Sequence, residues 1–180
     1  MQPKFNEITV PNLKDTEKLL LWSIREWIIS IIRAKDPRPK IIDCFSKILI
    51  QEAVIPFDNM MRTIGYNCSV PIDVRCHCSS LLGRTEIDII CLISIIQNKL
   101  QFDLRKVIKI SNKDIHAEMT KQSIKLIESL NRAKIKIPVR NQLLDKYQIK
   151  KYKMKNNVIF YDFKNKLEKN LLDFDNSYHY

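Results

Sequence analysis

Glycine is almost absent from this chain, which has only Gly65 and Gly83 among its 180 residues. Phosphate-binding loops and dinucleotide-binding fingerprints need several glycines at fixed spacing, because the backbone must approach the phosphates closely. Neither a P-loop nor a Rossmann site can therefore be assembled here. The G-x-S-x-G, H-E-x-x-H and Glu-x-x-His signatures are missing as well. We predict that the chain is not an enzyme.

Long apolar runs are also lacking. Arg25 and Glu26 interrupt the apolar stretch of residues 19–32, and the stretch of residues 87–96 is shorter than the roughly 20 residues that a bilayer requires. The first residues do not show the basic start and apolar stretch of a signal peptide. We therefore expect a cytoplasmic protein without membrane contact. The odd number of cysteines, five, predicts reduced thiols in a reducing cytosol.

The positive charge is unevenly distributed along the chain. The formal net charge is +11, of which residues 1–110 contribute +4 and residues 111–180 contribute +7. A basic half can indicate contact with nucleic acid or another anionic surface. The chain is also rich in Ile, Lys and Asn, as expected from an AT-rich genome. The lysine content is therefore weak support for nucleic-acid binding.

Apolar residues make up 45% of the chain, which is enough to build one hydrophobic core. The spacing of these residues predicts an all-α, single-domain bundle of five or six helices with one short extended segment that contains cysteines. We expect the helical domain to comprise residues 1–144. Residues 145–180, which are rich in lysine and poor in core residues, are expected to form a basic, mobile C-terminal appendage.

The most apolar helix is predicted over residues 86–97 and forms the centre of the bundle. Thr85 is a candidate N-cap, with Asp88 three residues later. Between Ile87 and Ile96 only Asp88 and Ser94 are polar, and a helix that is apolar on all sides belongs in the interior. A buried strand is the alternative, because periodicity cannot separate the two for a short run of Ile.

The other expected helices are placed by apolar periodicity, caps and prolines. Asn12 is expected to cap a helix that runs to about Ala34. The further helices are expected at residues 40–53, from Pro56 to a cap at Gly65, at 102–110, and from Ser111 to about Lys134, while residues 70–75 and 135–140 are expected to be extended. Of the two tryptophans on the first helix, Trp22 and Trp27, one should belong to the core and the other to its border. His116 is expected on the flank of the last helix.

Short motifs lie at residues 20–27 (LLWSIREW) and 71–78 (PIDVRCHC), together with Leu82, Glu86, Gln97, Ala133 and residues 138–140. This set of motifs resembles a family of small α-proteobacterial helical proteins without an established activity. The resemblance covers roughly residues 13–140 and omits the basic C-terminal segment. The chain departs from the Ala-, Leu- and Gly-rich members by its Ile and Lys content. The resemblance implies a bacterial cytosolic protein and assigns no functional residue.

A Cys-His-Cys triplet is the main candidate for chemistry. Cys76, His77 and Cys78, with Cys68 eight residues earlier, offer the ligand types that zinc prefers. In an extended segment Cys76 and Cys78 would point to one side, and Cys44 or Cys91 could complete the site. The spacing matches no familiar zinc motif. We therefore favour simple packing of the cysteines and keep zinc binding, and less strongly redox chemistry, as alternatives. On a strand, His77 would point away from both thiols, which argues against a thiol–imidazole pair.

A lysine cluster follows the last predicted helix. Its lysines could contact phosphates and its tyrosines could stack on bases of RNA or DNA. The alternative, which we favour, is a solvated segment. The candidate nucleic-acid-binding residues are Lys146, Tyr147, Lys150, Lys151, Tyr152, Lys153 and Lys155.

Burial accounts for nearly every notable residue of the sequence. We therefore expect a non-catalytic interaction or regulatory module that binds an unidentified protein partner and needs no cofactor. The alternatives are a nucleic-acid-binding accessory protein that uses the basic C-terminal segment, and a small zinc-binding protein with ligands near Cys76 and Cys78.

Overall fold

The computed structural model describes residues 8–100, 103–141 and 147. Chain contacts divide the protein into two compact units, residues 1–150 and 151–180, and all described residues belong to the first. The predicted appendage of residues 145–180 lies outside the described residues apart from Tyr147, and its proposed boundary remains a prediction.

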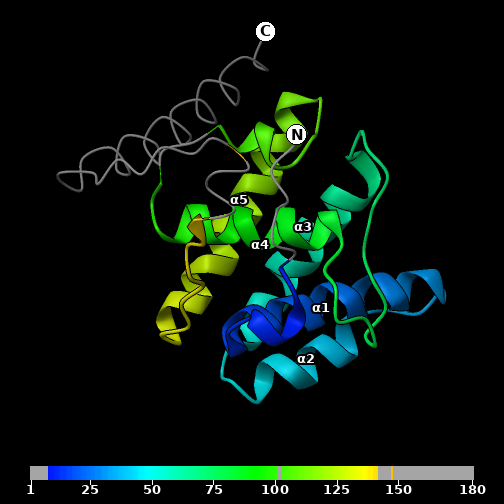
Figure 1. Ribbon diagram of the computed structural model, residues 1–180, viewed down its shortest axis with the longest axis vertical. Coiled ribbons are helices and arrows are strands. Elements are labelled where there is room, and N and C mark those ends of the chain that lie inside the picture. The colour runs from blue at the N-terminus through cyan, green and yellow to red at the C-terminus, as the bar shows by residue number, and fades with distance from the viewer. Residues whose placement is uncertain (1–7, 101–102, 142–146, 148–180) are drawn as a thin grey trace, which may run out of the picture. The chain divides into compact units, whose positions relative to one another are not determined.

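The described part of the chain is all-α, as predicted (Figure 1). Its five α-helices are α1 (Asp15–Ile32), α2 (Arg38–Ser46), α3 (Val54–Asn67), α4 (Arg84–Gln97) and α5 (Lys113–Arg132). Short 3-10 helices occupy Val10–Asn12, Gln51–Ala53 and Leu104–Lys106. In place of strands, two isolated bridges connect Thr9 with Leu81 and Cys68 with Ile110. None of the described helices is long and apolar enough to cross a membrane.

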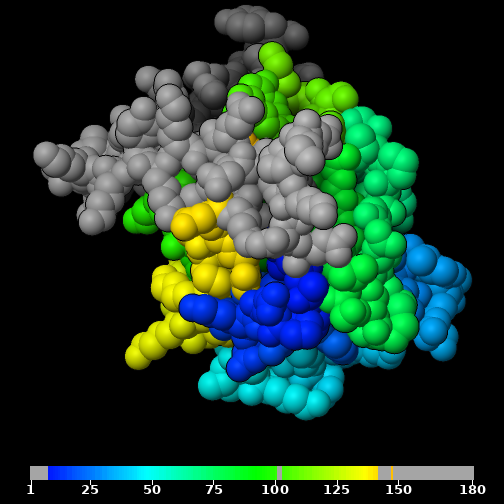
Figure 2. All heavy atoms as spheres, viewed as in Figure 1, coloured from blue at the N-terminus to red at the C-terminus, as the bar shows by residue number. Residues whose placement is uncertain are grey.

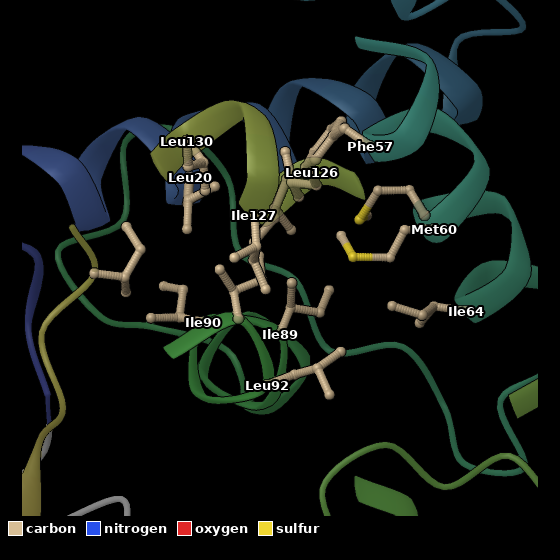
Figure 3. Close-up of a cluster of buried hydrophobic side chains, with 14 of the residues drawn as sticks. Leu20, Phe57, Met60, Ile64, Ile89, Ile90, Leu92, Leu126, Ile127 and Leu130 are labelled. Carbon is tan, nitrogen blue, oxygen red and sulfur yellow. The ribbon is translucent and has the colours of Figure 1, made fainter. Parts of the chain in front are cut away.

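Helix α4 is the centre of the core, as the sequence predicted. Every residue from Asp88 to Gln97 is buried. Figure 3 looks along α4 and shows apolar side chains of α1, α3 and α5 facing it, among them Leu20, Met60 and Leu126. An α-helix that is apolar on all sides is stable in water only when neighbours cover each side. The alternative of a buried strand is thereby excluded for this segment.

The start of α4 differs from the prediction. Gly83, and not Thr85, is the N-cap residue. The carboxylate of Glu86, in the third helical position, accepts a hydrogen bond of 2.7 Å from the Gly83 N–H and so satisfies a donor at the helix start. The Thr85 hydroxyl is then available to the loop that precedes the helix. The predicted capping role of Thr85 was therefore wrong by two residues.

Other helix ends also differ from their predicted positions. Asn12 lies in the first 3-10 helix, and α1 begins at Asp15 after a cap at Lys14. The helix predicted over residues 40–53 breaks after Ser46, where Leu49 adopts a left-handed conformation with φ of 59°. Gly65 lies inside α3 rather than at its end. The helix predicted over residues 102–110 is reduced to one 3-10 turn in its described part.

The last described segment, residues 133–140, is fixed against the C-terminal turn of α4. The Gln97 side chain accepts a hydrogen bond from the Ile137 N–H at 2.7 Å and donates one to the Ile135 carbonyl at 2.8 Å. Ser94 donates to the Pro138 carbonyl at 2.9 Å. At the end of the segment Arg140 forms an ion pair with buried Glu17 of α1. This segment is irregular, yet side chains of α4 pair several of its backbone groups.

Candidate functional site

Residues 68–83 form the connection between α3 and α4, which we call the Cys loop. It has no helix of its own and follows a long path beside α1 before it enters α4 (Figure 1). Figure 2 shows its green residues on the outside of the molecule next to the blue residues of α1. A loop of this length without regular structure is uncommon in a compact domain and is frequently functional.

A buried ion pair holds the Cys loop in place. Arg25 of α1 and Glu86 of α4 form two hydrogen bonds of 2.8 and 3.1 Å, and their side chains are only 3% and 0% exposed. Arg25 also donates to the backbone carbonyls of Ser79 and Leu81, at 3.0 and 2.8 Å. Glu86 accepts from the Arg75 N–H at 2.9 Å. Besides the bonds to each other, the two side chains therefore form hydrogen bonds with backbone groups of the Cys loop.

A second set of contacts closes the loop onto the start of α4. The Asp73 carboxylate accepts a hydrogen bond of 2.8 Å from the Arg84 N–H, and the Thr85 hydroxyl accepts one of 2.9 Å from the Asp73 N–H. A side chain at Gly83 would place its Cβ 2.3 Å from the Asp73 carbonyl oxygen. This distance is far below van der Waals contact, so the close approach requires glycine.

The tip of the Cys loop carries a disulfide bond between Cys76 and Cys78. Their Cα atoms lie 5.4 Å apart, a separation that a disulfide can span. The sequence predicted an extended segment here, but a turn at His77 and Cys78 brings the two sulfur atoms together. The prediction of reduced thiols is therefore wrong for this pair, whereas Cys44 and Cys68 are free thiols. The argument that a strand would separate His77 from the thiols also fails, because the segment is not a strand.

Glu26 of α1 meets three donors next to this turn. Its buried carboxylate contacts His77 Nε2 at 3.2 Å, Lys40 Nζ at 2.6 Å and the Ser30 hydroxyl at 3.0 Å. Burial alone would raise the pKa of Glu26, but the hydrogen bonds from Lys40 and Ser30, the charge of Lys40 and the contact with His77 together lower it. Glu26 is therefore an anion at neutral pH, and it connects α1, α2 and the Cys loop.

An aromatic contact adds to the same junction. The rings of Trp22 and His77 lie 6.1 Å apart with a tilt of 32°. Trp22 is half-buried and Trp27 is buried, which confirms that one tryptophan belongs to the core and the other to its border. The indole N–H of Trp27 donates to the Asp58 carboxylate at 2.7 Å. Trp22 thus supports the loop tip, while Trp27 supports the packing of α1 on α3.

The four predicted zinc ligands are not brought together. Cys68 ends α3 and forms a backbone bridge with Ile110, the sulfur atoms of Cys76 and Cys78 are bonded to each other, and His77 contacts Glu26. Among residues 8–100, 103–141 and 147, no three His, Cys, Asp or Glu side chains are grouped as metal ligands would be. The residues as they stand do not fit a zinc ion, and zinc binding remains an alternative hypothesis.

The candidate nucleic-acid-binding residues lie outside the described part of the chain, with one exception. Tyr147 is half-buried, and its hydroxyl contacts the carboxylate of Asp88 in α4. His116, expected on the flank of α5, is buried instead, and its Nε2 has no hydrogen-bond partner among the residues that the structure describes. Burial lowers the pKa of this histidine, and the nearby Leu104 backbone offsets only part of that effect.

The sequence reasoning missed the residues that fix the Cys loop: Arg25, Glu26 and Glu86. Arg25 and Glu26 were treated as interruptions of an apolar run and as part of the motif of residues 20–27, and no partner was assigned to either. Arg25 lies one turn after Leu21, on a side of the helix that is otherwise apolar, and this spacing was a signal that it is buried. A buried charge needs a partner, so a second charge on another apolar helix, such as Glu86, could have been sought.

Comparison with known proteins adds no further assignment: no family model, no curated protein and no solved structure matches this chain.

Proposed function

We propose that the protein is a non-catalytic interaction module and that the Cys loop is its recognition surface. The observation that supports this proposal is the use of the Arg25–Glu86 pair, whose remaining hydrogen bonds all go to backbone groups of the loop. A buried ion pair seldom stabilises a fold more than apolar residues of similar volume would. Its consequence here is a loop with one defined conformation.

A loop that is fixed in advance is suited to binding. Ordering a flexible segment on association costs conformational entropy, and a segment that is already ordered avoids this cost. The Cys loop is held near its start by Asp73, in the middle by Arg75 and Ser79, and at its end by Gly83. Its tip, residues 75–78, is exposed between these fixed points.

The charge around the tip favours an acidic partner. Lys40, Arg75 and Arg84 have side chains that are 61%, 52% and 56% exposed. Their acidic neighbours are less accessible, since Glu26 is buried and Asp73 is 40% exposed. Complementary charge steers association and selects among partners. We therefore propose that the partner is a protein that presents aspartate or glutamate side chains to the Cys loop.

Site-specific crosslinking in the native cell tests this proposal. A photoreactive amino acid would be placed at Ser80, which is exposed on the Cys loop, and in a matched variant at Lys125, which is exposed on α5. We expect a discrete adduct from position 80 and none from position 125. The protein that is crosslinked in this adduct, once purified, should bind the wild-type chain more weakly as the salt concentration rises.

A charge reversal then identifies the contact. Arg75→Glu replaces an exposed cation with an anion. The substitution should weaken the affinity about tenfold if Arg75 contacts an acidic side chain of the partner. Lys125→Glu, with the same change in net charge, should leave the affinity unchanged. Equal adducts from positions 80 and 125, or equal effects of the two reversals, would contradict the proposal.

A further inference from the structure

We infer that the Cys76–Cys78 bond is a reversible thiol–disulfide site that exchanges with low-molecular-weight thiols such as glutathione. This inference goes beyond the interaction role and does not depend on it. It rests on three features of the Cys loop: the exposure of both cysteines, the independent fixing of the backbone on each side of them, and the shortness of the ring that the bond closes.

Exposure separates this pair from the other cysteines. Cys76 and Cys78 are exposed at the loop tip, whereas Cys44 and Cys68 are half-buried and Cys91 is buried. Thiol–disulfide exchange requires that a thiolate reach a sulfur atom of the bond along its axis, so access limits the reaction. Of the five cysteines, the two at the loop tip are therefore the most accessible to a dissolved thiol.

The backbone on both sides of the bond is held by contacts that do not involve sulfur. Glu86 accepts from the N–H of Arg75, directly before Cys76, and Arg25 donates to the carbonyl of Ser79, directly after Cys78. The turn itself is closed by a 3.0 Å hydrogen bond from the Ser79 N–H to the Cys76 carbonyl. Reduction would therefore leave the two thiols close together, at a high effective concentration for closing the bond again.

The bond contributes little to the fold as a crosslink. In the chain-entropy account, the stabilisation by a disulfide grows with the length of chain between the two cysteines. Cys76 and Cys78 are two residues apart, so the ring is among the shortest that a disulfide can close. A bond that adds little stability and is accessible to solvent fits a reversible site better than a structural one.

The exchange proceeds in two balanced steps. The thiolate of a small thiol attacks one sulfur of the Cys76–Cys78 bond, and the other cysteine leaves as a thiolate that takes up a proton. A second small thiolate then attacks the small-molecule sulfur of the mixed disulfide, which forms the oxidised small-molecule disulfide and expels the remaining cysteine as a thiolate that takes up the second proton. The protein gains two electrons and two protons, and two molecules of the small thiol are oxidised to one disulfide.

The sequence around the site allows a direct measurement. Trypsin cleaves after Arg75 and Arg84, so both cysteines fall in one peptide, residues 76–84. The full chain would be equilibrated under native conditions in glutathione buffers stepped from mostly oxidised to mostly reduced, quenched in acid, unfolded, alkylated and digested. We expect the peptide to change from unalkylated to doubly alkylated within this series, while the helical circular dichroism stays constant.

Two results would overturn the inference. One is a peptide that is doubly alkylated even in the most oxidising buffer, because no bond then forms. The other is a peptide that stays unalkylated in the most reducing buffer unless the protein was unfolded first, because the bond is then inaccessible. Loss of the crosslink from Ser80 would alter neither result, so failure of the interaction role can be distinguished from failure of the redox site.

A single-cysteine variant provides a second measurement. Cys78→Ser leaves Cys76 without its partner, and we expect peptide 76–84 to carry one glutathione adduct after incubation with oxidised glutathione. Cys44→Ser, which removes a half-buried thiol elsewhere, is the matched control and should keep the intramolecular bond. Absence of the adduct from the folded Cys78→Ser protein, at a concentration that modifies a small cysteine peptide fully, would contradict the inference.

Discussion

The two ends of α4 fix two irregular segments by different means. At its start, the charged pair Arg25–Glu86 binds the backbone of the Cys loop, and at its end the neutral amide of Gln97 binds the backbone of residues 133–140. Both arrangements satisfy buried backbone groups, as a buried irregular segment requires. They differ in what remains when one partner is removed. A lost amide leaves unpaired dipoles, whereas a lost Arg25 leaves an unpaired charge.

The largest effect is expected from removing that charge. Arg25→Met should lower the free energy of unfolding by about 3–5 kcal/mol, because Glu86 would remain buried without its partner. Urea denaturation measures this, with Arg33→Met as the control on an exposed arginine of the same chain region. The double variant Arg25→Met with Glu86→Leu should recover part of the loss. If the double variant is less stable than Arg25→Met alone, the unpaired charge is not the dominant cost.

A smaller effect is expected where the Cys loop meets α4. Gly83→Ala should lower the free energy of unfolding by about 1–3 kcal/mol, since the added methyl group would overlap the Asp73 carbonyl. Gly65→Ala is the matched control: its Cβ would lie 3.6 Å from the Trp27 ring, in ordinary contact, and alanine favours the helix. We expect this control to be neutral or stabilising by up to about 1 kcal/mol. Equal destabilisation by both changes would refute the close approach at Gly83.

A substitution of Gln97, at the neutral end of α4, should lower the free energy of unfolding less than a substitution of Arg25. Gln97→Leu leaves the Ile137 N–H without an acceptor and should cost about 1–2 kcal/mol of unfolding free energy. Gln122→Leu on α5 is a suitable comparison, because the Glu118 carboxylate that Gln122 contacts is partly exposed and can bind water instead. A loss at Gln97 as large as that at Arg25 would show that charge is not what distinguishes the two ends.

The smallest effect is expected from His116 and depends on pH. Burial lowers its pKa in the folded protein, so the unfolded chain binds a proton more readily. The free energy of unfolding should therefore have its full value above the usual histidine pKa of about 6.5 and should decline as the pH falls below it. His116→Phe should flatten this decline in urea titrations between pH 8 and pH 5. An unchanged slope would show that other groups cause it.

The sequence predicted the parts of the fold that depend on apolar pattern. The all-α class, the buried position of α4 and the different roles of Trp22 and Trp27 all follow from spacing and burial. The start of α4 was predicted two residues too late, because Thr85 has a side chain typical of an N-cap. In the structure the Thr85 hydroxyl accepts a hydrogen bond from the Asp73 N–H, 12 residues earlier, and the N-cap is Gly83, whose N–H donates to Glu86. Such a contact cannot be read from local sequence.

The candidate site was located by sequence but not assembled by it. The Cys-His-Cys triplet lies at the tip of the Cys loop. Its geometry depends on a turn at residues 77 and 78, where the sequence predicted an extended segment. Glu26 contacts His77 from 51 residues away, and the local sequence around neither residue indicates this pairing. Long-range contacts between charged groups arise from how helices pack, and a single sequence carries that information only as unexplained charges within apolar stripes.

The arrangement of α4 also has a consequence for how the sequence can drift. The isoleucine and leucine residues of 89–96 are held by volume and apolarity, so exchanges among Ile, Leu, Val and Met that keep the total size should be tolerated at these positions, whereas Ser94 also donates a hydrogen bond to the Pro138 carbonyl. Positions 86 and 97 are bound by the direction and length of several hydrogen bonds each, and few side chains can replace them. Homologous chains should therefore exchange one aliphatic residue for another in the middle of this helix and should hardly vary at positions 86 and 97.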